Sequence, residues 1–434
     1  MLKKGGIQDN IASYRPISVT NNICRIFEKI IFNRLTEYLE NGNLLSPNQH
    51  GFRKYKSTLT NLVDTYNYVT QNLDLKNSVD VIYLDFEKAF DKVDHFLLLK
   101  KLNLYKIPPY ISSWISNFFL NRIQAVRIRK ACSNSLPVTS GVPQGSVLGP
   151  LLFVVYINDM FDITLYSKII SFADDTKILG LSKNRAFTQL DLNKIFDWCS
   201  QNNVSINFKK TVVMRFGTDN GDLSYVLDGN DLQVVTKTKD LGIIVDNKLK
   251  FSEHCFEVLK KCNYISYSIR RLFSKRTPKQ YFELFKLYVR PIIDYSIVFW
   301  FPTYEKYIKI VENIQKRFTK HICPRGLGYL ERLKLLSDST IEKRFSIFSC
   351  HFVYKCFHHL IHSDFVFYPA TSTVTRGHSK KLLIPYVRSP TRKSFCTIRS
   401  IAKWNALSNS VVTSSSFQAF KRALVCHHTP ELRA

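Results

Sequence analysis

The sequence is poor in acidic residues relative to basic ones. Its 434 residues include 62 Lys and Arg but only 34 Asp and Glu, which gives a formal net charge of +28. Such an excess favours a polyanionic partner, because basic side chains that neutralise phosphates release bound counterions. Charge alone also leaves open another kind of basic protein, such as a ribosomal or membrane-surface protein.

The ten cysteines form no C-x-x-C pair, and no pair of them has the spacing of a common zinc site. Cysteine and histidine do gather between Cys350 and His359. The surrounding stretch, 347–360, is also apolar at helical spacing, so we expect a helix there in preference to a metal site. We expect reduced thiols and no disulfide partner.

Long apolar runs are absent as well. The most apolar stretches, such as Leu151–Ile157, fall well short of the ~20 residues needed to cross a bilayer. The start of the chain, Met1–Gly6, lacks the apolar core of a signal peptide. We therefore expect an intracellular protein without a transmembrane segment, nuclear or cytoplasmic and associated with a ribonucleoprotein. The hydrophobic content of 45% predicts a folded core.

Two acidic motifs stand out against this background. Asp85 ends an apolar, β-branched stretch, and Asp174 and Asp175 lie between two short apolar stretches. Each motif alone has an ordinary interpretation, as a helix cap or a turn. Together they offer three carboxylates, the oxygen ligands that Mg²⁺ prefers. Because two divalent cations can align a 3′-hydroxyl with a nucleotide phosphate, the pair of motifs predicts a nucleic-acid polymerase core.

The segment Gly141–Pro150 is a second strong signal. Its glycines let the backbone approach a ligand closely, and Gln144, next to Gly145, offers both hydrogen-bond donors and an acceptor. Ser146 is placed to cap the helix that follows. An ordinary strand-to-helix turn is the alternative interpretation of this segment.

Hydrophobic periodicity predicts an alternation of helices and strands up to about residue 250, and mainly basic helices beyond it. Residues 10–50 are expected to be helical after Pro16, because Ile23, Ile26, Phe27, Ile30, Ile31 and Leu35 recur at helical spacing. The other predicted helices include 58–73, 94–104, 109–120, 148–156, 186–202, 256–273, 279–295 and 304–321. The predicted strands are 79–86, 124–129, 168–173, 176–181, 204–216 and 241–245. The stretch 362–394 lacks periodicity and is expected to be an exposed loop.

Seven segments, in this order, resemble the motifs of reverse transcriptases from non-LTR retrotransposons of the jockey-like LINE group. They are Tyr14–Ser18, Gln49–Thr58, Leu84–Val93, Gly141–Phe153, Phe172–Asp175, Asn207–Thr211 and Leu241–His254. The resemblance extends over about residues 1–330 and is weaker in the tail. An ordered series of motifs is far more specific than any single one.

The resemblance implies an α+β fold of the right-hand polymerase class, with an antiparallel palm sheet. It places fingers and palm in residues 1–250, a helical thumb-like region in 251–361 and a basic C-terminal region in 362–434. It implies an RNA-directed DNA polymerase that works on an RNA template, a DNA primer and deoxynucleoside triphosphates. The family normally carries an endonuclease upstream, which is not found in this sequence.

The resemblance also assigns roles in catalysis. Asp85, Asp174 and Asp175 would bind two Mg²⁺ or Mn²⁺ ions. Lys210 would donate a proton to the leaving pyrophosphate or position it. An ordinary solvated lysine is the alternative for Lys210.

Other residues would bind the nucleotide or the template. Phe90 would be the gate that excludes a 2′-hydroxyl, although an ordinary core position is the alternative. Arg53 would reach the incoming triphosphate, as would Arg15 or Lys54, unless these are simply exposed basic residues. Gln144 and Gly145 would contact the nucleotide or template. The alternative function is a catalytically inactive, truncated retroelement remnant that binds RNA.

Overall fold

The structure is a computed structural model that describes residues 2–3, 14–15, 17–128, 130–218, 224–274, 276–370 and 378–428. Of residues 2–3 and 14–15 it describes the backbone alone. Met1, Lys4–Gly6, Pro16 and Arg129, on which some of our predictions fall, lie outside these ranges, as does the side chain of Arg15.

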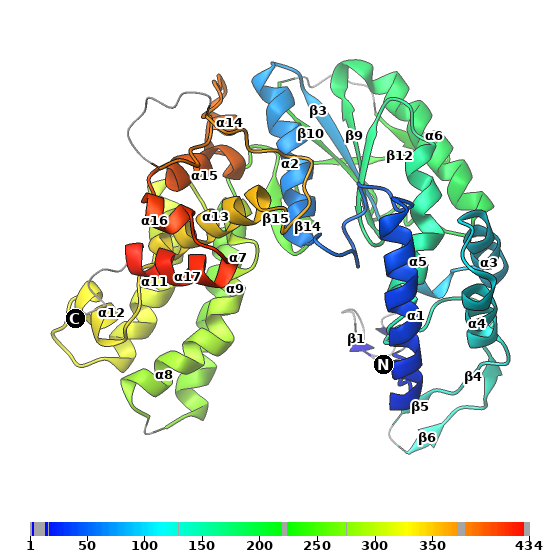
Figure 1. The fold of residues 1–434 in the computed structure, drawn as a ribbon, viewed down its shortest axis with the longest axis horizontal. Helices are drawn as coiled ribbons and strands as arrows, with labels where there is room; N and C mark the ends of the chain where they lie inside the picture. Colours follow the sequence, from blue (N-terminus) through cyan, green and yellow to red (C-terminus); the bar gives the residue numbers. More distant parts are fainter. Residues whose placement is uncertain are drawn as a thin grey trace. The chain divides into compact units, whose positions relative to one another are not determined.

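The chain forms two compact units that interleave along the sequence (Figure 1). The first comprises residues 1–57, 80–213 and 220–234, and the second comprises residues 58–79, 214–219 and 235–434. These units are defined by compactness alone. Our functional division into fingers and palm, thumb and tail stays a prediction.

The first unit combines five α-helices with a sheet. The helices are α1 (Asn22–Asn41), α3 (His95–Leu104), α4 (Pro109–Phe119), α5 (Gly149–Ile157) and α6 (Arg185–Gln201). A five-stranded sheet of order β13-β10-β3-β9-β8 lies mainly in this unit. Its strands are β3 (Val79–Leu84), β8 (Lys168–Phe172), β9 (Asp175–Leu181), β10 (Val212–Phe216) and β13 (Gln233–Val235). β8 and β9 pair antiparallel.

Four short antiparallel ribbons complete the first unit. They are β1 (Leu2–Lys3) with β2 (Tyr14–Arg15), β4 (Ile123–Gln124) with β7 (Leu136–Pro137), β5 (Arg127–Ile128) with β6 (Ala131–Cys132), and β11 (Val226–Leu227) with β12 (Asn230–Asp231).

The second unit is mainly helical. Its strands β14 (Lys237–Asp240) and β15 (Ile243–Asp246) pair antiparallel. Its helices are α2 (Thr58–Asp74), α7 (Ser252–Leu272), α8 (Pro278–Leu284), α9 (Arg290–Asp294), α10 (Ile297–Trp300), α11 (Glu305–Ile322), α12 (Tyr329–Leu335), α13 (Ile341–Phe357), α14 (Pro390–Ser394), α15 (Cys396–Asn405), α16 (Asn409–Val412) and α17 (Phe417–His428).

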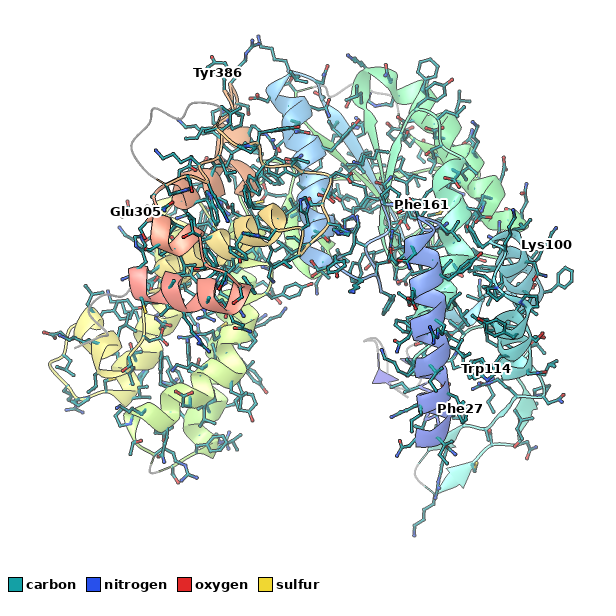
Figure 2. All side chains as sticks on the ribbon, in the orientation of Figure 1. Phe27, Lys100, Trp114, Phe161, Glu305 and Tyr386 are labelled. Atoms are coloured by element: carbon teal, nitrogen blue, oxygen red, sulfur yellow. The ribbon has the colours of Figure 1, made fainter. Side chains whose placement is uncertain are left out.

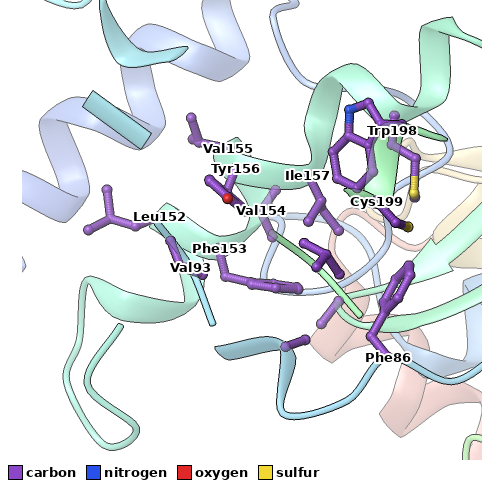
Figure 3. Packing of buried hydrophobic residues seen from close by; sticks show 14 of the residues in the cluster. Phe86, Val93, Leu152, Phe153, Val154, Val155, Tyr156, Ile157, Trp198 and Cys199 are labelled. Carbon is purple, nitrogen blue, oxygen red and sulfur yellow. The ribbon is translucent and has the colours of Figure 1, made fainter. Parts of the chain in front are cut away.

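The core of the first unit is built around α5. Every residue of this helix except Pro150 is buried, as expected for a short helix that is apolar on all sides. Phe153 and Tyr156 lie among the buried side chains of this core, together with Phe86, Val93 and Trp198 (Figure 3). The segments that carry the predicted site thus share one rigid core.

Helix α1 has a different environment. It begins where the Asn21 side chain accepts hydrogen bonds from the backbone N–H groups of Ile23 and Cys24, which is the usual role of an N-cap asparagine. The apolar residues that predict this helix are largely exposed, including Ile26 at 62% and Phe27 at 55% (Figure 2). The helix forms as predicted, and most of its apolar face does not contribute to the described core.

Several predicted strands are wrong in extent. Only Val212–Phe216 of the predicted strand 204–216 is a strand. The preceding residues form a turn, in which the backbone N–H groups of Lys210 and Thr211 donate to the Asn207 carbonyl. The predicted strand 124–129 is divided between β4 and β5, each of which pairs with a different partner.

Two predicted segments beyond residue 250 also differ. The helix predicted at 279–295 consists of α8 and α9 joined by a π-helical turn at Phe285–Val289. Pro291 follows this turn, and it cannot donate a backbone hydrogen bond. The predicted loop 362–394 ends in the helix α14.

Helix α2 packs in the second unit, although it precedes the sheet in sequence. It contacts α10, α14 and α15. Arg392 of α14 donates to the Asn67 side chain at 2.7 Å and to the Thr70 hydroxyl at 2.9 Å. Two buried polar side chains of α2 therefore have a partner more than 300 residues away.

Candidate active site

The aspartate pair lies at a tight hairpin, as predicted. Phe172 of β8 pairs with Asp175 of β9, and Ala173 and Asp174 form the turn between them. Ala173 has a φ of +54°, a conformation that residues other than glycine seldom adopt. Asp175 is exposed, and Asp174 is partly buried. The hairpin thus presents carboxylates beside a strained backbone position.

The segment 48–51 lies along the same hairpin. Gln49 bridges to Ser171 in parallel register, and the His50 N–H donates to the Ser171 carbonyl at 2.8 Å. Burial lowers the pKa of His50 well below its ordinary value, and the positive charges of Lys56 and Lys177 lower it further. His50 is therefore neutral at physiological pH and belongs to the support of the hairpin.

Asp85 directly follows β3, the strand next to β9 in the sheet. Its backbone carbonyl accepts from the Asn207 N–H at 2.7 Å. This contact places the turn 207–211 against Asp85 and brings the Lys210 ammonium to 3.6 Å from the Asp85 carboxylate. The structure thus brings together two residues that our predictions join, although they are far apart in sequence.

The chemistry of the donor set fits a divalent ion. Three carboxylates on neighbouring strands supply the oxygen ligands that Mg²⁺ prefers, and Mg²⁺ usually completes its shell with water and substrate phosphates. No group of three or more His, Cys, Asp or Glu side chains within the described ranges is already arranged around a metal position. The three carboxylates are thus of the right chemical type for Mg²⁺ but are not gathered around one metal position, and their binding of two ions stays a prediction.

Phe90 lies between two other aromatic rings. Its ring stacks on Phe153 of α5 with centroids 4.3 Å apart, and it meets the edge of Phe52 at 6.3 Å. The side chain is partly buried. Since Phe153 is fully buried, the Phe90 ring packs against the core of the unit on one face.

The Gln144 loop is fixed to the segment that carries Phe90. The Val142 N–H donates to the Phe90 carbonyl at 2.8 Å, and the Gln144 side-chain amide donates to the Asp91 carboxylate at 2.8 Å. Because this carboxylate accepts from the amide nitrogen, the Gln144 side-chain oxygen is the atom left to accept from a ligand. Asp91 is a residue that our sequence reasoning missed.

Gly145 has a role in packing. Its φ is +111°, and a Cβ atom at this position would lie 2.7 Å from the Ser18 carbonyl oxygen.

The Glu28 carboxylate of α1 is fully buried and accepts from the Val147 and Leu148 N–H groups at 2.7 and 3.0 Å. A carboxylate at the start of α5 is favourable, and it holds the end of the loop in place. Glu28 was also missed, because no local pattern marks it.

Arg53 is engaged elsewhere. Its guanidinium group forms a bidentate pair with the Glu40 carboxylate, at 3.0 and 2.5 Å, and also donates to the Ser46 carbonyl at 2.5 Å. Only 10% of its side chain is exposed. The structure does not bring Arg53 together with the aspartates, and its contact with a triphosphate stays a prediction.

The sequence model of the reverse transcriptase (RNA-dependent DNA polymerase) family matches residues 2–269. Because this match covers more than half of the chain, the protein belongs to that family. The predicted family and the predicted α+β, right-hand polymerase fold are confirmed. Enzymes of this family generally use divalent metal ions.

Relatives of known type agree with this placement. The chain is 28% identical over 365 residues to the probable RNA-directed DNA polymerase from transposon BS of Drosophila melanogaster. The aligned region covers 79% of the chain and 40% of that relative. The chain is also 32% identical over 265 residues to the RNA-directed DNA polymerase from the mobile element jockey of the same species. Here the aligned region covers 58% of the chain and 29% of the relative. The predicted resemblance to non-LTR retrotransposon enzymes is confirmed, and the chain spans less than half the length of these relatives.

Among solved structures, apo telomerase from Candida tropicalis is similar with a TM-score of 0.42 and 11% identity, over 75% of this chain and 53% of that one.

In the part of the chain that the structure describes, no helix is both long and apolar enough to span a membrane.

Proposed function

We propose that this protein is an RNA-directed DNA polymerase of a non-LTR retrotransposon, which adds deoxynucleotides to a primer 3′-hydroxyl as directed by an RNA template. The observation that carries the proposal is the family match over residues 2–269, within which all predicted site residues lie. We also propose that it acts in an intracellular ribonucleoprotein with RNA template, DNA primer and deoxynucleoside triphosphates as partners.

In this proposal Asp85, Asp174 and Asp175 hold two divalent ions, Mg²⁺ or Mn²⁺. When bound, such ions supply alignment of the 3′-hydroxyl with the α-phosphate and stabilise the developing charge. Lys210, whose ammonium lies 3.6 Å from the Asp85 carboxylate, would place a cation near the negative charge of the leaving pyrophosphate. Its ammonium group can donate a proton to that leaving group.

Phe90 and the Gln144 loop would bind the nucleotide or the template. The ring of Phe90 is supported by Phe153 and would meet the sugar at its 2′ position. The Gln144 side chain, oriented by Asp91, would offer an acceptor to a hydroxyl or N–H group of the nucleotide or the template. Both contacts select by shape and hydrogen bonding and not by charge.

The test is primer extension on an RNA template with Mg²⁺ or Mn²⁺. Replacing Asp174 or Asp175 by Asn removes a charged ligand at little steric cost. We expect activity to fall on the order of 10³-fold or more, since each ion supplies several kcal/mol to the transition state. Asp162→Asn, at an exposed carboxylate in the same unit, is the matched control and should extend at the parental rate.

A second candidate is an inactive protein that binds RNA. It is favoured by one observation, the bidentate pairing of Arg53 with Glu40, which occupies a guanidinium group that we expected to bind a triphosphate. A parent protein that binds RNA but does not extend primers would support this candidate. Extension by the double variant Asp174→Asn, Asp175→Asn at the parental rate would refute the proposed site.

A further inference from the structure

Gln49 is a fully buried side chain whose amide group contacts the turn of the aspartate hairpin. Its side-chain oxygen accepts from the Gly51 N–H at 2.7 Å and from the Ala173 N–H at 2.9 Å. Its side-chain nitrogen donates to the Ala173 carbonyl at 3.4 Å. One amide group therefore binds both backbone polar groups of Ala173, the residue directly before Asp174.

Ala173 occupies a position that usually requires glycine. It is the first of two residues in the turn that joins Phe172 to Asp175, and its φ is +54°. A positive φ at the first central residue is typical of the type II′ hairpin turn, in which glycine is preferred. An alanine there costs free energy, so the conformation persists only where the surroundings impose it.

The surroundings of the turn are built for a close fit. A Cβ atom on Gly51 would lie 2.3 Å from the Ala173 nitrogen, so the two backbones are in direct contact. On either side of Gln49, the Asn48 carbonyl accepts from the Ser171 N–H at 3.0 Å, and the His50 N–H donates to the Ser171 carbonyl. The segment is thus tied to β8 by its backbone and to the turn by the Gln49 side chain.

We propose that Gln49 is a positioning residue, which holds Ala173 in its left-handed conformation and thereby sets the direction of the Asp174 and Asp175 carboxylates toward divalent ions. This inference rests on the proposed function only in that these carboxylates bind cations. The competing explanation is that Gln49 merely satisfies buried backbone groups and stabilises the fold.

Two substitutions separate these explanations. Gln49→Met removes both the carbonyl oxygen and the NH2 group of the side-chain amide while keeping an unbranched side chain of similar length. Ala173→Gly removes the preference against a positive φ. If Gln49 acts by imposing this conformation, a glycine at position 173 makes the amide less necessary. The double variant should then recover the affinity for divalent ions that the single variant Gln49→Met loses.

A matched control exists in the same unit. Asn158 is also a buried side-chain amide that joins two backbone groups, since it accepts from the Ser46 N–H at 2.8 Å and donates to the Leu44 carbonyl at 2.8 Å. Neither of these groups belongs to the hairpin. Asn158→Leu should therefore lower stability without affecting the binding of cations.

Mn²⁺ binding to each purified variant, measured by electron paramagnetic resonance of the free ion, gives a readout that does not depend on activity. We expect Gln49→Met to weaken the Mn²⁺ affinity by about tenfold, which corresponds to loss of a strained backbone position. The double variant with Ala173→Gly should return to within about threefold of the parent protein. The Mg²⁺ concentration at half-maximal primer extension should shift in the same order.

The proposal is overturned if Gln49→Met and Asn158→Leu both lower the midpoint of thermal unfolding and leave the Mn²⁺ affinity unchanged. It is equally overturned if Ala173→Gly gives no recovery. Should Gln49→Met not fold, Gln49→Asn takes its place, because it adds no charge but shortens the side chain by one methylene and so withdraws the amide from Ala173. An intermediate loss of Mn²⁺ affinity is then expected, and an unchanged affinity contradicts the proposal.

Failure of the proposed function has a different signature. A parent protein whose Mn²⁺ binding depends on Asp174 but which does not extend primers contradicts the polymerase activity and leaves the role of Gln49 open to the same Mn²⁺ comparison. A parent protein whose Mn²⁺ binding is unaffected by Asp174→Asn contradicts both.

Discussion

Phe90→Val should change the choice of sugar. The Phe90 ring stacks on Phe153 with centroids 4.3 Å apart and an interplanar angle of 21°, so moving it aside for a 2′-hydroxyl would break this contact. Valine keeps the position apolar and removes the ring. A clash worth about 1.4 kcal/mol already corresponds to a factor of ten in discrimination. We therefore expect ribonucleotide incorporation to rise by at least about tenfold relative to deoxynucleotide incorporation.

The same substitution has a cost in stability that must be separated from its effect on the sugar. Loss of the stacked pair costs about 0.5–1.5 kcal/mol beyond the loss of buried area. Phe119→Val is the matched control, because Phe119 stacks on His95 in a similar way, with centroids 4.2 Å apart and an angle of 21°. It should lower the thermal midpoint to a similar degree and leave sugar discrimination as in the parent protein.

Single-nucleotide incorporation with a deoxynucleotide and the matching ribonucleotide measures the ratio directly. If Phe90→Val is folded and active and the ratio does not change, Phe90 is a core residue and not a gate. A rise in ribonucleotide use by Phe119→Val as well would attribute the effect to general loosening of the unit.

Two further predictions concern binding and stability. Affinity for RNA should fall about 10³–10⁵-fold between 50 and 200 mM salt if about 6–10 phosphates are neutralised. An affinity that does not change with salt in a filter-binding titration would show that the net positive charge does not serve to bind RNA phosphates. Burial lowers the pKa of His254 and His351 to about 4, below the ordinary 6.5. The unfolded chain therefore binds protons at these histidines more readily than the folded chain does. The free energy of unfolding should fall as the pH is lowered from about 6.5 toward 4, by up to about 3 kcal/mol for each histidine. Urea unfolding at pH 7.5 and pH 5 checks this, and His351→Phe should be less sensitive to acid than the parent protein.

The local elements of the site could be predicted from the sequence. The strand that ends at Asp85, the hairpin at Asp174 and Asp175, and the apolar helix after Pro150 each leave a pattern within a few residues. Such patterns reflect steric preferences and periodic burial, which act locally. The extent of the strand at 204–216 was wrong because the turn at 207–211 depends on its contact with Asp85, which lies more than 120 residues earlier in the chain.

Contacts between distant segments could not be predicted in this way. Arg53 resembles a residue that binds a triphosphate, but whether its guanidinium group is available depends on Glu40, 13 positions earlier, and on the path of the chain between them. The buried side chains of Asn67 and Thr70 in α2 would be costly without hydrogen-bond partners, and Arg392 of the distant helix α14 donates to both. The sequence gives no local sign of these partners.

Three residues to which the sequence analysis assigned no individual role share a physical property that explains both this omission and their place in the site. Gln49, Asp91 and Glu28 each bind a backbone or side-chain group of a neighbouring motif. A carboxylate that binds an ion must be held in position more closely than a two-residue turn can hold it alone, because the turn at Ala173 is itself strained. The support therefore has to come from another part of the chain, and the motif at 49–53 supplies it to the hairpin at 172–175. On this argument the early motif is needed near the aspartates even if none of its side chains touches a nucleotide.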